Sequence, residues 1–476
     1  MEADRFRRAR VAAAVGGVAL AVAAGHALGS AFALQEQSGS GLGNAFAGGA
    51  ASAEDASTIY FNPAGMSRLP GPQGVVAGNL ICPSTKFSDN GSQPSGSPPF
   101  TQPLGGNGGD AGSCAVVPAL YVAVPIDKQW AVGLGVSAPF GLKTEYDSNW
   151  IGRFQGVESK LETININPAV SFKASDTLTV GGGVSWQRVK ATLTSQVNYQ
   201  GAIGLAGAAF SVPPSALGPI LVAYTGAESS AKVEGNDNSW GWNVGLLVEP
   251  DKQTRIGLAY RSWIKYTIGG TASFNNPPVP ALPPTLTPTA TLLANGVNNA
   301  QLYNGNVSLQ LKVPETANLS IFRQVDNKWD VMADLQYTGW QSFQNLTIVR
   351  TDGPANGTNL QSVPENFKAT WRGAVGANYH YTDQWMFRGG IAYDQSPVNN
   401  TDRTPRLPDD DRTWFSVGAQ YKFSPQAWLD FGYTFIYIKN PSINQNDGST
   451  AANGLISGNY HNNVNLAALQ LTYTFK

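Results

Sequence analysis

The sequence predicts an all-β fold: a transmembrane antiparallel β-barrel of about 14 strands whose lumen is plugged by an N-terminal segment, residues 30–72, which we call the hatch. Three observations predict it: strands of alternating apolar and polar residues, short turns that alternate with long loops, and a secretory N-terminus. Segments of about ten alternating residues separated by turns are typical of outer-membrane barrels. This fold limits the function to passage, recognition or catalysis at a bacterial outer membrane.

The first 29 residues are organised like a signal peptide. Four arginines come first: Arg5, Arg7, Arg8 and Arg10. The apolar stretch from Val11 to Leu28 follows, and small residues at 27 and 29 predict cleavage before Ser30. A second candidate site lies four residues later, after Ala33. We therefore expect residues 1–29 to be removed on export, the alternative being a retained helical anchor.

The hatch does not alternate. Small residues fill its first half, from Ser38 to Ala51, and the triplet Asn62, Pro63 and Ala64 follows. Because this segment precedes the first strand, we expect it at the periplasmic end, inside or below the lumen. A barrel of this width leaves space that a plug can fill.

Residues 73–476 form the predicted barrel. Leu429, Phe431, Tyr433, Phe435 and Tyr437 share one face of a strand, and Asp430, Gly432 and Thr434 share the other. A period of two with one aromatic and one polar face indicates a strand between lipid and a wet interior. Short turns, as at 125–128 and 249–252, alternate with long segments such as 84–113 and 441–459. The breaks divide the chain into an even number of strands, about 14.

Charged residues inside the strands share the face opposite the aromatics: Arg261, Asp334, Arg372, Arg388, Asp394 and Asp430. A lipid-facing Arg or Lys at mid-bilayer costs about 2–4 kcal/mol, so any barrel turns such residues inward. They either anchor the hatch or a ligand's head group, or pair with one another in the lumen.

The third strand contains a proline where a closed barrel needs an unbroken ladder. Pro139 cannot donate a backbone hydrogen bond, and prolines stay at edges or bulges of sheets. A closed barrel has no edge, so Pro139 predicts a kink or gap in the wall, with Phe140 and Gly141 at its rim. The alternative places Pro139 beyond the membrane band.

Two loops are unusually apolar for an outer surface. Segment 199–230 carries Phe210, Leu217 and Leu221, and segment 276–304 has leucines among prolines. Exposed apolar patches mark binding surfaces, and a groove there would capture a greasy ligand from water. Contact with lipopolysaccharide is the alternative.

The remaining composition excludes several classes of partner. The net charge is −1 with 13% charged residues, so the chain has no electrostatic footprint for nucleic acid. Cys82 and Cys114 are the only cysteines, and we expect an oxidising compartment to join them across a loop, the alternative being two buried thiols. No histidine lies near them, so we expect no metal, and no motif calls for a cofactor.

Several blocks taken in order resemble the FadL/TodX (OmpP1) family of outer-membrane transporters for long-chain fatty acids and hydrophobic compounds. They begin with Ser38–Ala45 and Asn62-Pro63-Ala64 in the hatch and continue with Gly141–Tyr146. The most specific block is Phe387–Pro397, followed by Leu407–Arg412. The resemblance covers nearly all of the chain after the signal peptide.

The resemblance implies a plugged fourteen-stranded barrel that captures ligand in a groove between extracellular loops. It further implies a deeper pocket beside the start of the hatch, where Phe32 and Leu34 match the family's apolar residues. Release would then run sideways through the kink at 139–141. A lateral exit is physically sensible, because a hydrophobic solute gains nothing by entering the aqueous periplasm.

The chain departs from the family's fatty-acid members at the ligand head group. Where those members place cations in strands five and nine, this sequence has Leu193 and Thr347, with Arg350 or Arg372 as substitutes. An apolar pocket without a cation disfavours a carboxylate. The hypotheses are therefore passive uptake of fatty acids or similar lipophiles, or import of neutral hydrocarbons.

An enzyme or a general porin fits the sequence less well. The predicted mature chain has only His380 and His461, and no GxSxG, HExxH or P-loop motif. A porin would need neither hatch nor apolar loops. We expect a monomeric outer-membrane protein whose partners are a hydrophobic small molecule, membrane lipid, lipopolysaccharide and the barrel-assembly machinery.

Overall fold

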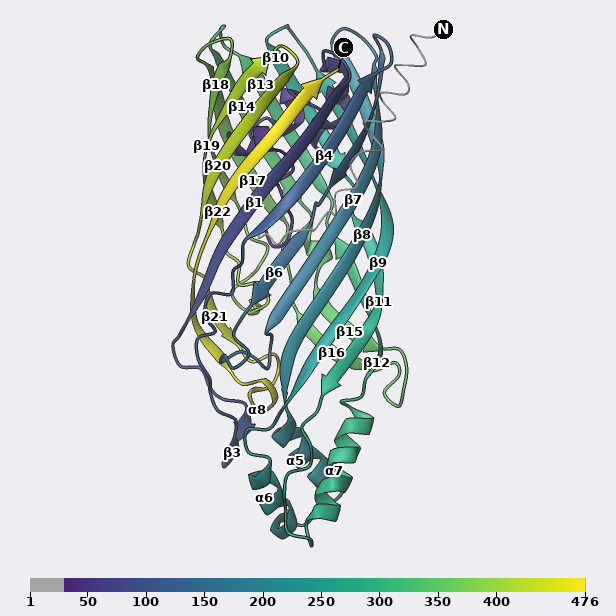
Figure 1. The fold of residues 1–476 in the computed structure, drawn as a ribbon, viewed down its shortest axis with the longest axis vertical. Helices are drawn as coiled ribbons and strands as arrows, with labels where there is room; N and C mark the ends of the chain where they lie inside the picture. The colour runs from purple at the N-terminus through teal and green to yellow at the C-terminus, as the bar shows by residue number, and fades with distance from the viewer. Residues whose placement is uncertain (1–29, 476) are drawn as a thin grey trace.

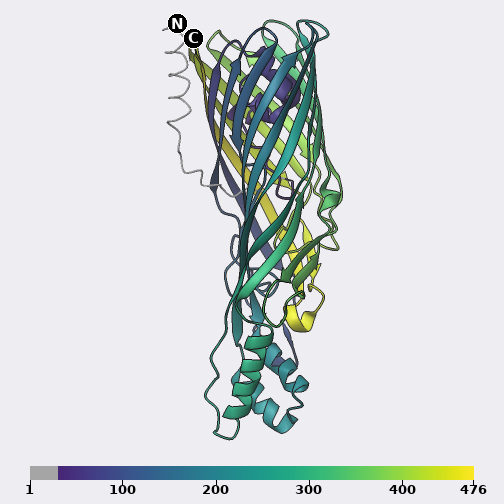
Figure 2. The ribbon, with the colours of Figure 1, turned by 90° about the vertical axis from the view of Figure 1, so that its right-hand side faces the viewer.

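The computed structural model describes residues 30–475, so the predicted signal peptide, residues 1–29, lies outside the described residues. The chain forms a long β-barrel of tilted strands, with short turns at one end and, at the other, extended strands that lead to helices (Figures 1 and 2). The first strand pairs with the last along 17 residues, from Gln73↔Thr474 to Asp89↔Gly458, so the barrel is closed. By the length of their loops, the helical end is extracellular and the other end periplasmic.

The barrel has fourteen antiparallel strands, as the sequence predicts, several of them interrupted. The uninterrupted strands are β1 (Gln73–Asp89), β4 (Ala115–Pro125), β7 (Glu158–Lys173), β8 (Leu178–Asn198), β9 (Glu228–Val248), β18 (Trp385–Asp394), β19 (Arg412–Ser424) and β22 (Ile456–Thr474). The interrupted ones are β5 (Trp130–Ser137) with β6 (Gly141–Glu145), β10 (Thr254–Arg261) with β11 (Ile264–Asn275), β12 (Gly305–Val313) with β13 (Thr316–Gln324), β14 (Trp329–Thr338) with β15 (Asn345–Arg350), β16 (Asn359–Pro364) with β17 (Thr370–His380), and β20 (Ala427–Ile438) with β21 (Ser442–Gln445). A small hairpin, β2 (Gly96–Ser97) and β3 (Phe100–Thr101), lies outside the barrel sheet.

The predicted alternation follows the two faces of the wall. Phe431 and Tyr433 are about half exposed on the outside, whereas Asp430 and Thr434 are fully buried within. Among residues 30–475, no helix is both long and apolar enough to cross a bilayer.

The segment predicted as the hatch lies inside the barrel near its periplasmic end (Figure 1). It contains α2 (Gly39–Leu42), α3 (Gly49–Ser52), α4 (Thr58–Phe61) and the 3₁₀ helix η1 (Pro63–Arg68). These pack against opposite walls, α2 on β19, β20 and β22 and η1 on β7, β8 and β9. The segment therefore fills the lumen from wall to wall.

Lumen-facing charges hold the hatch. Arg388 bridges Glu54 of the hatch at 2.6 Å and Asp430 of the wall at 2.9 Å. Arg372 donates to Ala45 O, and Arg261 donates to Tyr60 O. The sequence predicts that the inward charges either anchor the hatch or a ligand, or pair with one another. These three arginines all contact the hatch.

The Asn62-Pro63-Ala64 triplet lies against glycine residues of the barrel wall. The Asn62 amide donates to Ala50 O and to Leu246 O of β9, at 2.7 and 2.9 Å. A Cβ on Gly245 would lie 1.9 Å from Asn62 Oδ1, and one on Gly181 would lie 2.4 Å from Ala64 N. Only glycine lets the wall approach the hatch this closely.

The two apolar loops are helical, which the sequence did not predict. They form α5 (Tyr199–Ala209), α6 (Pro214–Ala223) and α7 (Thr287–Ala300), and a short α8 (Thr450–Asn453) follows later in the chain. Asn198 caps α5 by accepting from Gly201 N, and proline opens α6. Their many Gly, Ala and Pro residues hide the helical period, so tertiary packing decides the outcome.

Candidate ligand path and wall opening

The wall is broken at Pro139. β5 pairs with β7 up to Ser137↔Asn165, and the pairing resumes in β6 at Gly141↔Glu162. Three residues, 138–140, therefore lie opposite only two, 163–164. Phe140 is held by a side chain instead of the ladder: its N–H donates to Thr163 Oγ1, and that hydroxyl donates to Phe140 O. The extra residue pushes 138–140 out of register as a bulge.

Beyond the bulge, the neighbouring strand loses its partner. β4 pairs with β5 only from Leu120↔Val136 to Pro125↔Ala131, and β6 pairs with β7 alone. Residues 115–119 of β4 therefore have no ladder partner on that side. The wall is open between β4 and β6, and buried Leu34, Val117 and Ala138 belong to one hydrophobic cluster.

The start of the hatch closes this opening from inside. Leu34 N donates to Pro139 O at 2.8 Å, and Gly141 N donates to Phe32 O at 2.9 Å, making an antiparallel bridge between Ala33 and Phe140. Gln37 Nε2 donates to Leu34 O and Ala138 O. Backbone groups that the bulge leaves unpaired are thus satisfied by a segment that is not part of the wall.

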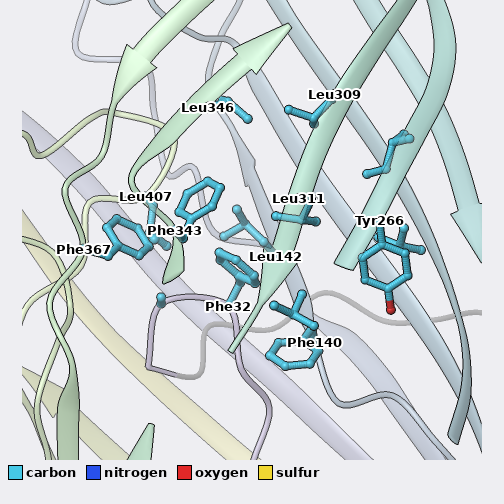
Figure 3. Close-up of a cluster of buried hydrophobic side chains, with 14 of the residues drawn as sticks. Phe32, Phe140, Leu142, Tyr266, Leu309, Leu311, Phe343, Leu346, Phe367 and Leu407 are labelled. Carbon is cyan, nitrogen blue, oxygen red and sulfur yellow. The ribbon is translucent and has the colours of Figure 1, made fainter. Parts of the chain in front are cut away.

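Above this closure lies an apolar cavity of about 80 Å³. Phe32 points into it between Phe343 and Phe140, with Leu142 and Leu311 alongside (Figure 3). Aromatic rings surround Phe32: Trp340 at 4.5 Å, Phe343 at 5.8 Å and Phe140 at 6.1 Å between centroids. The predicted ligand residue Leu193 also lines this cavity.

Three charged residues line the same cavity: Glu365, Arg406 and Lys160, which is paired with Glu162 at 3.0 Å. Arg406 is 6% exposed; its Nη1 donates to Glu158 O and Ser159 Oγ, and its Nε has no partner among the described residues. Burial raises the pKa of Glu365 to about 8, and burial lowers the pKa of Arg406 only to about 10. At neutral pH Arg406 therefore stays charged, whereas the Glu365 carboxyl is mostly protonated.

Further cavities lie above and below the central one. A cavity of about 390 Å³ includes Val157 and Ser195, which continue the inner face of β7 and β8 outward from Leu193. On the other side of Phe32 and Phe140, a cavity of about 60 Å³ is lined by Leu34, Pro139 and Phe140. The three follow one another from the extracellular end to the wall break.

The outer end of this series reaches the helices. Leu217 and Leu221 pack in the core between α5, α6 and α7, and Phe210 is 52% exposed at the end of α5. Phe274 packs against both this core and the cluster around Phe32. The predicted capture residues and the central cavity are thus connected through β11.

The two arginines predicted as substitute cations lie elsewhere. Arg350 donates to Tyr303 O and Gln301 O, and neither it nor Arg372 lines the central cavity. Thr347 forms a hydroxyl contact with Ser362. The buried cation of the cavity is Arg406, from the loop between β18 and β19. It is not among the predicted site residues, and its only signal in the sequence is an arginine just before the Leu407–Arg412 block.

Cys82 and Cys114 are joined by a disulfide beside the open edge of β4, one residue before its pairing with β1 begins at Ala115↔Ile81. Among residues 30–475, no group of three His, Cys, Asp or Glu side chains is placed to hold a metal ion.

A second buried acid lies in the hatch beside the closure. Glu36 is fully buried, and neither carboxylate oxygen has a hydrogen-bond partner in the described part of the chain. Burial raises the pKa of Glu36 to about 7, outweighing the nearby Arg412 and Arg372. Its charge state therefore changes near neutral pH, four residues from Phe32.

Comparisons with known proteins match this geometry. Residues 20–475 match the model of the family described as "Outer membrane protein transport protein (OMPP1/FadL/TodX)". The chain is 32% identical to the long-chain fatty acid transport protein of Escherichia coli K12, covering 90% of this chain and 92% of that one. It is 31% identical to outer membrane protein P1 of Haemophilus influenzae, with coverage of 96% and 98%.

Solved structures share the architecture. A Pseudomonas aeruginosa FadL homologue superposes with a TM-score of 0.80 at 27% identity, covering 94% of this chain and all of that one. The Pseudomonas putida toluene transporter TodX shares the fold, with a TM-score of 0.62 at 18% identity over 88% of this chain and 94% of its own. The chain is an outer-membrane β-barrel that belongs to the OMPP1/FadL/TodX family of transport proteins.

Proposed function

We propose that this protein takes up hydrophobic molecules passively, from the cell exterior into the outer membrane. The observation that carries the proposal is the series of cavities from the helices α5–α7, past Leu193 and Phe32, to the wall break at Pro139. Each buried methylene contributes about 0.8 kcal/mol, so an alkyl chain gains free energy on leaving water at the first cavity. If the ligand then leaves into the bilayer, its alkyl chain never returns to water and the free energy gained is retained.

The hatch acts as the gate in this proposal. Residues 32–34 occupy both the cavity and the opening, so a ligand leaves only when this short bridge separates from 139–141. Nothing in the path calls for a nucleophile, metal or cofactor, and we propose transport without a catalytic step. We also propose a monomer, inserted by the barrel-assembly machinery and surrounded by lipid and lipopolysaccharide.

The substrate class follows from Arg406. Arg406 is a buried residue of a largely apolar cavity, and its Nε has no partner among the described residues. An anionic head group would supply that partner. We therefore favour long-chain fatty acids, named for the Escherichia coli relative, over the neutral hydrocarbons named for TodX.

Deleting Pro139 tests the route. The deletion lets two residues face two and restores the ladder between β5 and β7. Expected is loss of both oleate and toluene uptake by cells that have no other transporter, with normal barrel folding and surface exposure. Uptake at the wild-type rate would show that ligands do not leave through this opening.

Replacing Arg406 by leucine tests the substrate. Removing one charged partner of a buried carboxylate costs about 2–5 kcal/mol. Oleate binding and uptake should fall steeply, whereas oleyl alcohol, with the same chain and no charge, should bind as well or better. Arg350→Leu is the control arginine outside the cavity. Equal loss of acid and alcohol would assign Arg406 a purely structural role.

A further inference from the structure

A second break interrupts the wall between β9 and its neighbour, away from the gate. β9 pairs with β10 up to Asn243↔Arg261, and its pairing resumes with β11 at Asn236↔Gly269. Six residues of β9, 237–242, therefore lie opposite seven residues, 262–268. On the lipid-facing side, Trp240, Trp242 and Trp263 surround it, 67%, 49% and 47% exposed. Exposed tryptophans at this height mark the outer membrane–water interface.

Directly outward of these tryptophans, two lysines oppose each other. Lys265 of β11 is the register partner of Lys312 of β12, both on the outer face. Like charges directly opposite in a sheet repel and destabilise the pair. Arg188 lies on the same outer face of β8, bonded only to the neutral Asn236 side chain at 3.3 Å.

Neighbouring carboxylates do not neutralise these cations. Within residues 30–475, no carboxylate oxygen lies within 4.0 Å of Arg188, Lys265 or Lys312. Asp237 accepts from Thr267 N instead, and Glu315 packs against Gly339. Four other outward lysines have an acidic partner: Lys86 with Asp110, Lys143 with Glu145, Lys160 with Glu162 and Lys232 with Glu234.

We propose that Arg188, Lys265 and Lys312 bind a phosphate of lipopolysaccharide in the outer leaflet, with an acyl chain lying over the tryptophans below. Lipid A is the anionic lipid of the outer leaflet, with its phosphates at the membrane–water interface and its acyl chains in the bilayer beneath. Lys312 Nζ lies 4.6 Å over the Trp263 ring, so the cation and the apolar contact are adjacent. This site needs only the outer-membrane location and does not depend on the transport route.

The test uses the purified full-length protein and three probes: lipid A with both phosphates, lipid A with its phosphates removed, and inorganic phosphate as competitor. A lysine near an anionic membrane contributes about 1 kcal/mol, so Lys265→Gln with Lys312→Gln should weaken binding of phosphorylated lipid A about 30-fold. The matched control is Lys86→Gln with Lys143→Gln, which removes two paired outward lysines. Heat-dependent gel migration checks that both variants are folded barrels.

The proposal requires three results: weak binding only in the Lys265/Lys312 variant, weak binding of dephosphorylated lipid A by wild type, and little competition by inorganic phosphate. Equal binding by both variants would overturn it. So would full displacement by inorganic phosphate, which would identify a free-anion site. Oleate uptake should be unchanged in the variant, which separates this result from the transport proposal.

Discussion

Two breaks in the barrel wall have the same form, one extra residue on one strand of the ladder, yet they are filled differently. At the first break, residues 32–34 of the hatch supply the missing hydrogen bonds. At the second, the wall fills its own gap: buried Ile264 packs against Gly241, where a Cβ would lie 2.8 Å from Ile264 Cγ1.

The two fillings differ in how easily they can leave the gap. Ile264 cannot leave its gap unless the strand unfolds, because β11 is held to β12 from Ile264↔Val313 onward. The hatch start is held at its opening by a few backbone bonds and by burial of Phe32 and Leu34. Of these two breaks, only the first therefore has a local opening of low free energy available.

The largest effect should come from locking the first break. Ala33→Cys with Phe140→Cys places two cysteines at bridge partners, whose Cα separation suits a disulfide. Oxidised protein should lose uptake, and mild reduction should restore it. Each single variant is the control, and continued uptake by the fully oxidised double variant would mean that 32–34 need not move.

A smaller effect should follow pH through Glu36. Its pKa is raised by burial to about 7, so the carboxyl stabilises the docked hatch fully below its ordinary pKa of 4.5, and this stability is lost as pH rises through 7. Hydrogen exchange of Leu34 N–H, corrected for intrinsic rates, should accelerate between about pH 4.5 and 7 and level off above pH 7. Glu36→Gln should remove that acceleration; an identical pH profile in the variant would exclude Glu36 as its cause.

The disulfide should contribute stability more than function. Cys82 and Cys114 close a loop with a sequence separation of 32, which by chain entropy corresponds to about 4 kcal/mol at most. Replacing both by serine should lower the free energy of unfolding by up to that amount, measured by urea titration in detergent, and should leave oleate selectivity as it is. A change in the ratio of oleate to oleyl alcohol uptake would contradict this.

The smallest effect should come from the second break. Gly241→Ala forces Ile264 to shift slightly and should cost about 1 kcal/mol of stability by overpacking. Uptake should match wild type, since no ligand passes there. Reduced uptake in a stably folded variant would show that both breaks serve the path.

The sequence predicted those features that are local or periodic. Alternation predicted fourteen strands, and the break lies at Pro139, where a missing N–H was visible in the chain itself. The place of Arg406 in the central cavity could not be predicted, because nothing in the nearby sequence distinguishes it from Arg403 or Arg412. It reaches the cavity only because its loop folds into the barrel. The break at β9 was also hidden, since it arises from a count of residues on two strands and has no proline to mark it.

The contacts of Gln470 have a consequence for how the molecule is assembled. Its side chain accepts from Gly39 N and donates to Asp55, joining the hatch to the last strand across 431 residues of chain. The plug therefore cannot reach its final state before β22 is in place, and β22 closes the cylinder by pairing with β1. Final docking of the hatch therefore depends on the same strand that closes the cylinder, although the two segments stand at opposite ends of the chain.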